Sequence, residues 1–323
     1  MRKGLSSTSI VIGLVLSGGT ALLPVGLATA EYRAGMCNFD MSALKFRGTD
    51  LEQAKCLLRP TEPRGKSGKS LAVLPAPFEK VIGKPFRLDA ARFEKYLAEI
   101  NIKPDALGGS IGEKLSRSVA GDKPYARYFV IHDVSLNYCE DRTKLLVADQ
   151  PNEVWNSTAR WKNNDQAHLY ITRDGKLIAP QGRTFATPWY ATKLEKQNPD
   201  RARGLFLHIE NVQLRNVIPD KNGRTREFKE SENEETKEPR KGECLNDYDA
   251  QKPGLTQIQY SRLALAYIAA SHRAGKWLVP AYHLSVDSGI NDGHDDPQNF
   301  NLTDFGSKVC DHLKALGHDE CVI

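Results

Sequence analysis

The chain has 323 residues, with 45 Lys or Arg against 40 Asp or Glu, a formal net charge of +5. This excess of basic side chains is too small and too evenly spread to indicate a nucleic-acid-binding protein. The length allows one large domain, or one domain with a smaller addition.

The first 30 residues predict a secretory signal peptide. Arg2 and Lys3 form a basic start, an apolar stretch around Ile10–Leu16 follows, and Ala28-Thr29-Ala30 is a small-x-small cleavage site. Residues 4–30 carry no charge, so an uncleaved membrane anchor is the alternative, although their Gly, Ser, Thr and Pro content disfavours a spanning helix. We therefore expect a periplasmic or secreted protein with no integral membrane segment after cleavage.

All six cysteines follow this segment, and an even number in an oxidising compartment predicts disulfides. Sequence alone does not choose among the possible connectivities. The pairs that lie close in the chain, Cys37–Cys56 and Cys310–Cys321, are favoured, and they leave Cys139–Cys244 as a guess. The chain has no CxxC-type zinc cluster, so none of these sulfurs is assigned to a metal.

Residues 31–119 predict a small N-terminal helical appendage with a linker, whose function the sequence does not reveal. Its first part shows helical spacing of Leu44, Leu51, Ala54 and Leu57. The chain from 60 to 85 is rich in Pro, Gly, Lys and Ser, which is typical of a connector. Residues 89–100 predict a better helix, capped by Asp89, with an apolar face of Phe93, Tyr96, Leu97 and Ile100.

Strand patterns begin after residue 120. Tyr125–Val134 is a buried-strand run that carries His132 near its end, and Gly204–Val212 is another strand. Between them, His168–Pro180 predicts a β-hairpin in which Asp174-Gly175 supplies the residues of a type I′ turn. Together with the helices that follow, these strands predict an α/β fold with a mixed central β-sheet flanked by helices.

Two helices and one insertion complete residues 120–323. Leu255–Lys276 is an amphipathic helix with Thr256 as its N-cap, and residues 304–317 form a closing helix. The chain from about 217 to 253 is nearly all charged or turn-forming and has little to bury. We interpret it as a solvated insertion; a loop that contacts an anionic polymer is the alternative.

A group of metal-ligating residues stands out in Val279–Phe300, which contains two histidines and four aspartates. His283 ends an apolar run, and Asp296 returns from a turn-rich loop just before Pro297. An imidazole and a carboxylate from two ends of one loop can supply two ligands of a metal site. A catalytic zinc needs a third protein ligand and an open position, and we predict that His132 is that ligand.

Four segments appear in one order: a strand ending in IHDVS, a hairpin HLYITRDG, a strand LHIENV, and AYH followed by DDPQNF. Over roughly residues 120–316 this order resembles the zinc-dependent N-acetylmuramoyl-L-alanine amidases of the type 2 amidase and peptidoglycan-recognition-protein superfamily. The resemblance implies Zn²⁺ held by His132, His283 and Asp296. It also places the catalytic glutamate of that family on Glu210.

Further matches are AHLYITRDG with the family's hairpin, LTQIQY with its helix start, and Pro188-Trp189-Tyr190-Ala191 with its AWHAG segment. They imply substrate contacts from His168, Trp189 and Tyr190. The chain departs from the family where Tyr190 replaces a histidine, Tyr282 replaces a glycine and His294 replaces a lysine. These departures affect substrate detail and rate more than metal binding.

The resemblance implies hydrolysis of the amide between N-acetylmuramic acid and L-alanine in peptidoglycan or muropeptides, by a monomer. Desolvation on an apolar strand should raise the pKa of Glu210, which suits it to take a proton from water and give it to the leaving amine. His294 would stabilise the tetrahedral oxyanion. His208 lies two residues before Glu210, on the same face of the strand, and is a candidate supporting group.

Each assignment has a structural alternative. His132 could be a core histidine, Asp296 a turn cap, and Glu210 an ion-pair partner. His294 could simply be a solvated loop residue, and His168 a surface residue of the hairpin. The remaining histidines, in polar helical or terminal contexts, are expected at the surface: His272, His312 and His318.

The function also has alternatives. A module that binds peptidoglycan without cutting it is the main one, and the intact ligand set argues against it. A cysteine peptidase built on Cys139 is disfavoured, because Glu140 and Asp141 would raise the pKa of the thiol. The chain contains no GxSxG motif of a serine hydrolase.

Overall fold

A five-stranded mixed sheet organises the fold. In the computed structural model its order is β13 (Val279–Tyr282), β6 (Tyr128–Asp133), β10 (Phe206–Asn211), β8 (Leu169–Ile171) and β9 (Leu177–Ile178). The first four strands are parallel and β9 is antiparallel to β8. Strands β13, β6, β10 and β8 are buried along their whole length, as expected for parallel strands covered on both faces. The predicted mixed α/β architecture is confirmed at this level.

The structure describes residues 31–32, 37–62, 66–113, 115, 125–138, 149–189, 191–216, 249–250, 254–290, 294–318 and 321. Several sequence predictions lie outside these ranges. They are the signal peptide at 1–30, the Cys139–Cys244 pairing, the substrate contact of Tyr190 and nearly all of the charged insertion.

The predicted hairpin is present but its turn differs. The backbone N–H of Thr172 donates to the carbonyl of Lys176, so Arg173, Asp174 and Gly175 form the connection. Gly175 adopts φ 82°, the left-handed conformation that glycine reaches without steric cost. A three-residue loop of this kind ends in a left-handed residue, whereas the predicted type I′ turn has only two.

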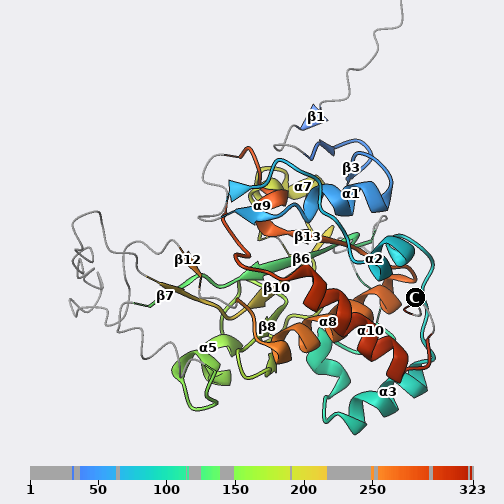
Figure 1. Cartoon of the computed structure of the whole chain (residues 1–323), viewed down its shortest axis with the longest axis vertical. Helices are drawn as coiled ribbons and strands as arrows, with labels where there is room; N and C mark the ends of the chain where they lie inside the picture. The colour runs from blue at the N-terminus through green and yellow to red at the C-terminus, as the bar shows by residue number, and fades with distance from the viewer. Residues whose placement is uncertain are drawn as a thin grey trace, which may run out of the picture.

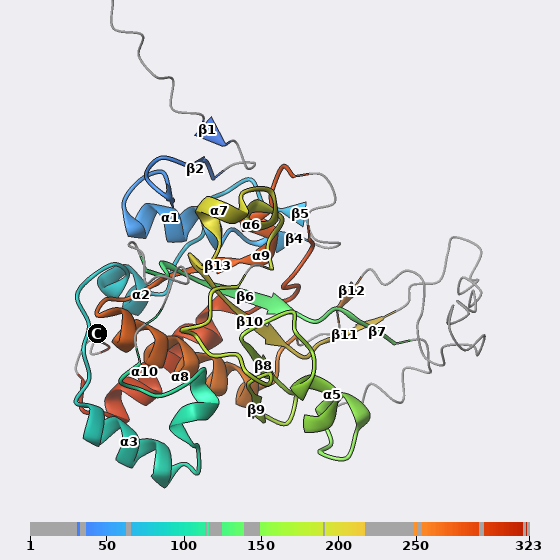
Figure 2. The ribbon, with the colours of Figure 1, turned by 180° about the vertical axis from the view of Figure 1, so that it is seen from behind.

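Helices α8 (Gln257–Ala274) and α10 (Leu302–Ala315) confirm the two predicted C-terminal helices. The side chain of Thr256 accepts the backbone N–H of Gln259, and the glutamine side chain closes the capping box. The two helices pack against each other and lie along the sheet (Figures 1 and 2). Apolar residues on nearly every turn of α8 are buried, which makes it the central helix of the core.

The remaining elements are short. The helices are α1 (Asp50–Leu57), α2 (Ala76–Val81), α3 (Ala90–Glu99), η1 (Pro104–Leu107), η2 (Val154–Asn156), α5 (Thr158–Lys162), α6 (Lys193–Gln197), α7 (Pro199–Ala202) and α9 (His283–Val286). The strands are β1 (Glu31–Tyr32), β2 (Phe39–Asp40), β3 (Lys45–Phe46), β4 (Thr61–Glu62), β5 (Lys66–Ser67), β7 (Leu136–Tyr138), β11 (Leu214–Asn216) and β12 (Asp249–Ala250). Helix α3 confirms the predicted N-terminal helix, and Asp89 caps it as expected.

The N-terminal segment shares one core with the sheet. The rings of Phe39 and Phe46 pack against Phe206, and Phe46 also lies edge-on to Tyr128 at 5.3 Å. The Tyr128 hydroxyl donates to Gln53 of α1 and accepts the backbone N–H of Phe46. Described residues between 37 and 115 therefore contribute to the same hydrophobic core as the sheet.

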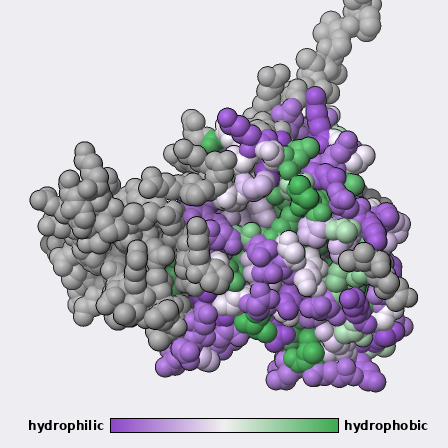
Figure 3. All heavy atoms as spheres, viewed as in Figure 1, coloured by the Kyte–Doolittle hydropathy of each residue, from purple (hydrophilic) through white to green (hydrophobic). Residues whose placement is uncertain are grey.

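Two disulfides join residues close in the chain, Cys37–Cys56 and Cys310–Cys321, as the sequence predicts. Within the described ranges, no helix is both long and apolar enough to cross a membrane. Figure 3 shows hydrophilic side chains over most of the coloured surface, with hydrophobic ones in smaller groups among them.

Candidate metal centre

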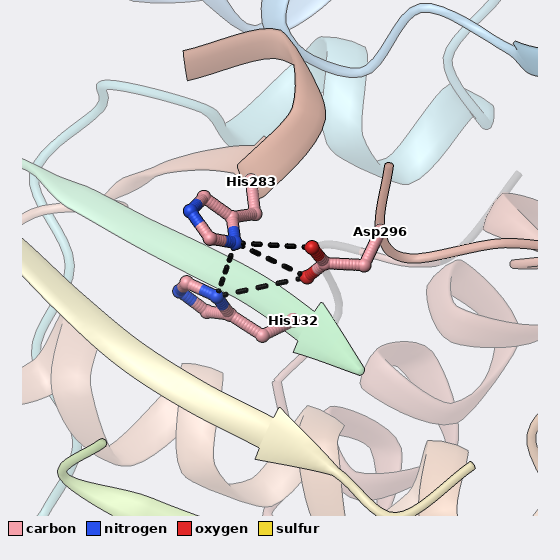
Figure 4. Close-up of side chains that lie close together, drawn as sticks. All are labelled: His132, His283 and Asp296. Carbon is pink, nitrogen blue, oxygen red and sulfur yellow. Dashed lines mark hydrogen bonds and ion pairs between the residues drawn. The ribbon is translucent and has the colours of Figure 1, made fainter. Parts of the chain in front are cut away.

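Three side chains from distant parts of the chain meet at the carboxyl end of the sheet (Figure 4). His132 lies near the end of β6, His283 begins α9 directly after β13, and Asp296 lies on the loop before α10. The Nδ1 atoms of the two histidines are 2.9 Å apart. The Asp296 carboxylate lies 3.1–3.2 Å from Nδ1 of His283 and 3.7 Å from Nδ1 of His132.

These three groups form a suitable ligand set for a divalent ion. Each offers one ligand atom within 4.8 Å of the others, and all three residues are buried. Burial, and then the positive charge of His283, hold the pKa of His132 well below its usual range. Metals coordinate the neutral form of imidazole, so a low pKa favours His132 as a ligand.

A carboxylate holds the far side of the His283 ring. Nε2 of His283 lies 3.0 Å from Oδ2 of Asp287, and the Asp287 carboxylate also accepts the backbone N–H groups of Lys193 and Leu194 at the start of α6. Burial acts to lower the pKa of His283, but Asp296 and Asp287 outweigh it and raise that pKa to about 10. The Asp287 contact occupies Nε2 and leaves Nδ1 to face the site.

The end of β6 holds the third candidate ligand, Asp296. The backbone N–H of Asp133 donates to Oδ2 of Asp296 over 3.2 Å. The Asp133 side chain accepts the backbone N–H of Gln298 at 2.9 Å, and the N–H of Leu284 donates to the Asp296 carbonyl. These bonds tie Asp296 and Gln298 to β6 and α9, and so hold the Asp296 carboxylate in place.

Glu210 lies beside the three ligands, as its register predicts. It pairs with His132 across β10 and β6, and its Oε1 is 3.8 Å from Nδ1 of that histidine. Burial, and then the nearby carboxylate of Asp296, raise the pKa of Glu210 well above its usual value. Its Oε2 has no hydrogen-bond partner in the part of the chain that the structure describes. Glu210 is thus a buried carboxyl group of raised basicity beside the three candidate ligands.

The ligands open onto a cavity of about 580 Å³. Glu210, Trp189 and His294 lie on its wall, together with Asp133, Val134, Ser135, Asp165, Gln166, Ala191 and Lys196. The guanidinium of Arg183 stacks over the Trp189 ring at 3.5 Å and supports it. The wall therefore offers an aromatic ring, a lysine and several carboxylates.

His294 lies on the outer side of His283. The two rings stack with centroids 3.9 Å apart, and the side chain of His294 is 41% exposed. Burial, and then the positive charge of His283, lower the pKa of His294, so its neutral ring can only act as an N–H donor or as an acceptor. Its role in catalysis stays a prediction.

His168 is buried, and among the described residues its ring nitrogens face backbone groups. Its Nδ1 accepts the N–H of His208 and its Nε2 faces the carbonyl of Thr187. It is absent from the residues that line the cavity, so the structure does not place it among the substrate contacts that the resemblance implied. The prediction of surface positions is wrong for His272 and His312, which are both buried.

Sequence reasoning missed the contribution of three residues to the site. Asp133 directly follows His132, and Asp287 is one of the four aspartates of Val279–Phe300, but neither was given a role. Glu195 lies next to His208, which in turn lies next to His132, and all three side chains are buried. Its local signal was a capping box, Thr192-Lys193-Leu194-Glu195, which marks a helix start and says nothing of a site.

Comparison with known proteins adds no relative. A scan against protein-family models found no match, and searches among curated proteins and among solved structures found none either. The assignment of a function therefore rests on the residues and geometry described above.

Proposed function

We propose that this protein is a zinc-dependent amidase that hydrolyses the amide between N-acetylmuramic acid and L-alanine in peptidoglycan or muropeptides. One observation carries the proposal: His132, His283 and Asp296 converge beside Glu210 at the wall of a cavity. This grouping agrees with the roles that the sequence resemblance implies for these four residues.

Two imidazole nitrogens and one carboxylate oxygen are ligands that zinc prefers, so His132, His283 and Asp296 would hold the ion and would leave one coordination position for water. A zinc ion bound there supplies a Lewis acid that makes water a nucleophile at neutral pH and polarises a carbonyl. The low pKa of His132 favours the neutral ring that a metal needs. The contact of Asp287 with Nε2 of His283 leaves Nδ1 of that ring facing the site.

Glu210 acts as general base and then as general acid. Its raised pKa allows the carboxylate to accept a proton from the attacking water and to return it to the nitrogen of the leaving L-alanine. His294, at the edge of the site, donates an N–H to the oxyanion of the tetrahedral intermediate. This histidine takes the place of the lysine that the resembling family carries.

The cavity wall supports a substrate with a sugar and an acidic peptide. The Trp189 ring offers an apolar face of the kind that packs against sugars, and Lys196 offers a cation for a stem-peptide carboxylate. Disulfides fit an oxidising compartment such as the periplasm or the cell exterior, where peptidoglycan lies.

The test is a digestion of purified muropeptides by zinc-loaded protein, followed by mass spectrometry. We expect released peptides with a free L-alanine amino terminus, and no release by Glu210→Gln. Products cut within the peptide or the glycan would assign another specificity. Binding of muropeptide with no cleavage would favour the recognition module instead.

A further inference from the structure

A buried line of side chains runs from the metal centre to helix α6. Nε2 of His132 lies 3.1 Å from Nδ1 of His208, and Nε2 of His208 lies 3.0 Å from Oε2 of Glu195. The three residues come from β6, β10 and α6, and none is more than 1% exposed. Neither His208 nor Glu195 reaches the cavity, so substrate contact does not explain them.

The capping of α6 does not fully explain Glu195. Its Oε2 accepts the backbone N–H groups of Ala191 and Thr192 and the Thr192 hydroxyl, as a capping box requires. Capping boxes normally lie at the surface, because a carboxylate is costly to bury without a matching donor. Nε2 of His208 lies 3.0 Å from Oε2 of Glu195 and makes no other hydrogen bond among the described residues, although the angle of this contact falls short of a regular hydrogen bond. Oε1 of Glu195 has no hydrogen-bond partner among the described residues.

The geometry selects one tautomer along the line. A carboxylate is an acceptor, so it favours the proton of His208 on Nε2 and leaves Nδ1 of that ring as an acceptor. The Nε2 atom that faces it on His132 must then carry the proton. His168, whose ring stacks on His208, supplies no competing donor, because its two nitrogens face backbone groups.

We propose that Glu195 is a positioning residue for the metal centre: through His208 it holds His132 in the tautomer whose Nδ1 lone pair points at the ion. The inference rests on the metal site of the proposed function. It gives the two ligand histidines equivalent support, since Asp287 holds His283 directly and Glu195 holds His132 through a second ring. Such groups behind a ligand fix its orientation and strengthen metal binding.

Three variants separate this role from capping. Glu195→Met removes both oxygens at similar length. Glu195→Gln keeps an oxygen that can face His208 without the charge. Thr192→Ala is the matched control, because it removes the capping hydroxyl and leaves the carboxylate opposite His208.

The first readout is the zinc dissociation constant, measured by competition with a chelator. We expect about 10–100-fold weaker binding for Glu195→Met, an intermediate value for Glu195→Gln, and a value within about twofold of the unmutated protein for Thr192→Ala. Unchanged binding by Glu195→Met would overturn the proposal, and so would equal losses in Glu195→Met and Thr192→Ala.

The second readout needs neither zinc nor activity. Nitrogen-15 NMR of the histidine rings in the zinc-free, unmutated protein should show His132 protonated on Nε2 and unprotonated on Nδ1. A proton on Nδ1 with Nε2 bare would overturn the proposal, even if Glu195→Met fails to fold. If the unmutated protein binds no zinc, the proposed function fails, whereas the tautomer still decides whether Glu195 orients His132.

Discussion

Nδ1 of His132 and Nδ1 of His283 face each other at 2.9 Å, although 151 positions separate the two residues in the chain. The parallel pairing of β13 with β6 produces this contact. Tyr282 lies opposite Ile131, and the two histidines are the next residue after each member of this pair. Two buried nitrogens at this distance need a proton or a metal ion between them, since two lone pairs repel. The contact is thus either a hydrogen bond or an ion-binding pair, and the predictions below separate these states.

The first prediction concerns metal content. Residues 31–323, purified with zinc present, should carry about one ion per chain, as expected for a site with three protein ligands. His283→Ala should lose it, because the loss of one of three ligands leaves only an imidazole and a carboxylate. Elemental analysis measures both, with His318→Ala as a control away from the site. An unmutated protein that takes up no zinc would contradict the metal centre.

The second prediction separates catalysis from binding. Glu210→Gln should keep the zinc but lower the rate of substrate cleavage about 10²–10⁴-fold. The side chain of the new glutamine cannot accept a proton from the attacking water. The experiment compares zinc content and muropeptide turnover in the same preparation. Turnover equal to that of the unmutated protein would remove Glu210 from its role.

The third prediction concerns the protons that zinc displaces from His283 when it binds. Asp296 and Asp287 raise the pKa of His283 to about 10 against the effect of burial, so the metal-free ring carries two protons at neutral pH. An ion at Nδ1 displaces one of them, and the apparent zinc affinity should rise about tenfold per pH unit below pH 10. Calorimetry at pH 7 in buffers of different ionisation enthalpy should show about one proton released.

That titration is best done with Glu210→Gln, since burial also raises the pKa of Glu210 and this carboxyl group would otherwise add protons of its own. Heats that do not depend on the buffer would mean that His283 is already neutral in the metal-free protein.

The fourth prediction concerns acid stability. His312 bridges Tyr96 and Ser261, and burial lowers its pKa from 6.5 to about 4. Between pH 6.5 and 4 the unfolded state binds a proton at His312 that the folded state does not bind. The free energy of unfolding is therefore unaffected above pH 6.5 and decreases as the pH falls towards 4. Urea unfolding between pH 7 and 4 should show a loss of up to about 3 kcal/mol that His312→Gln lacks. Equal pH slopes for both proteins would contradict it.

The fifth prediction tests whether the N-terminal segment belongs to the core. Leu57 of α1 is fully buried, whereas Leu71 is 53% exposed. Leu57→Ala should lower the free energy of unfolding by about 2–5 kcal/mol, and the matched Leu71→Ala by no more than about 0.5 kcal/mol. Urea denaturation of the two variants measures the difference. Similar small losses in both would contradict the burial of Leu57 in the core.

The sequence by itself determined the local elements. The apolar runs predict the strands around His132 and Glu210, and the hydrophobic periodicity with the Thr256 cap predicts the helix that follows it. Each of these elements depends on neighbours within a few positions. The chain order of four motifs singled out His132, His283 and Asp296 as one group, and the two short-range disulfides were also predicted.

Only the tertiary structure decided what surrounds that group. His272 and His312 lie in polar stretches of their helices, yet both are buried by segments distant in the chain. The periodicity of a single helix cannot predict burial by such segments. In the same way Glu195 faces His208 only because α6 packs behind β10, and Asp287 accepts the N–H groups of Lys193 and Leu194 only because α6 lies beside α9. Burial and proton placement depend on contacts between residues far apart in the chain, and these exist only once the sheet has assembled.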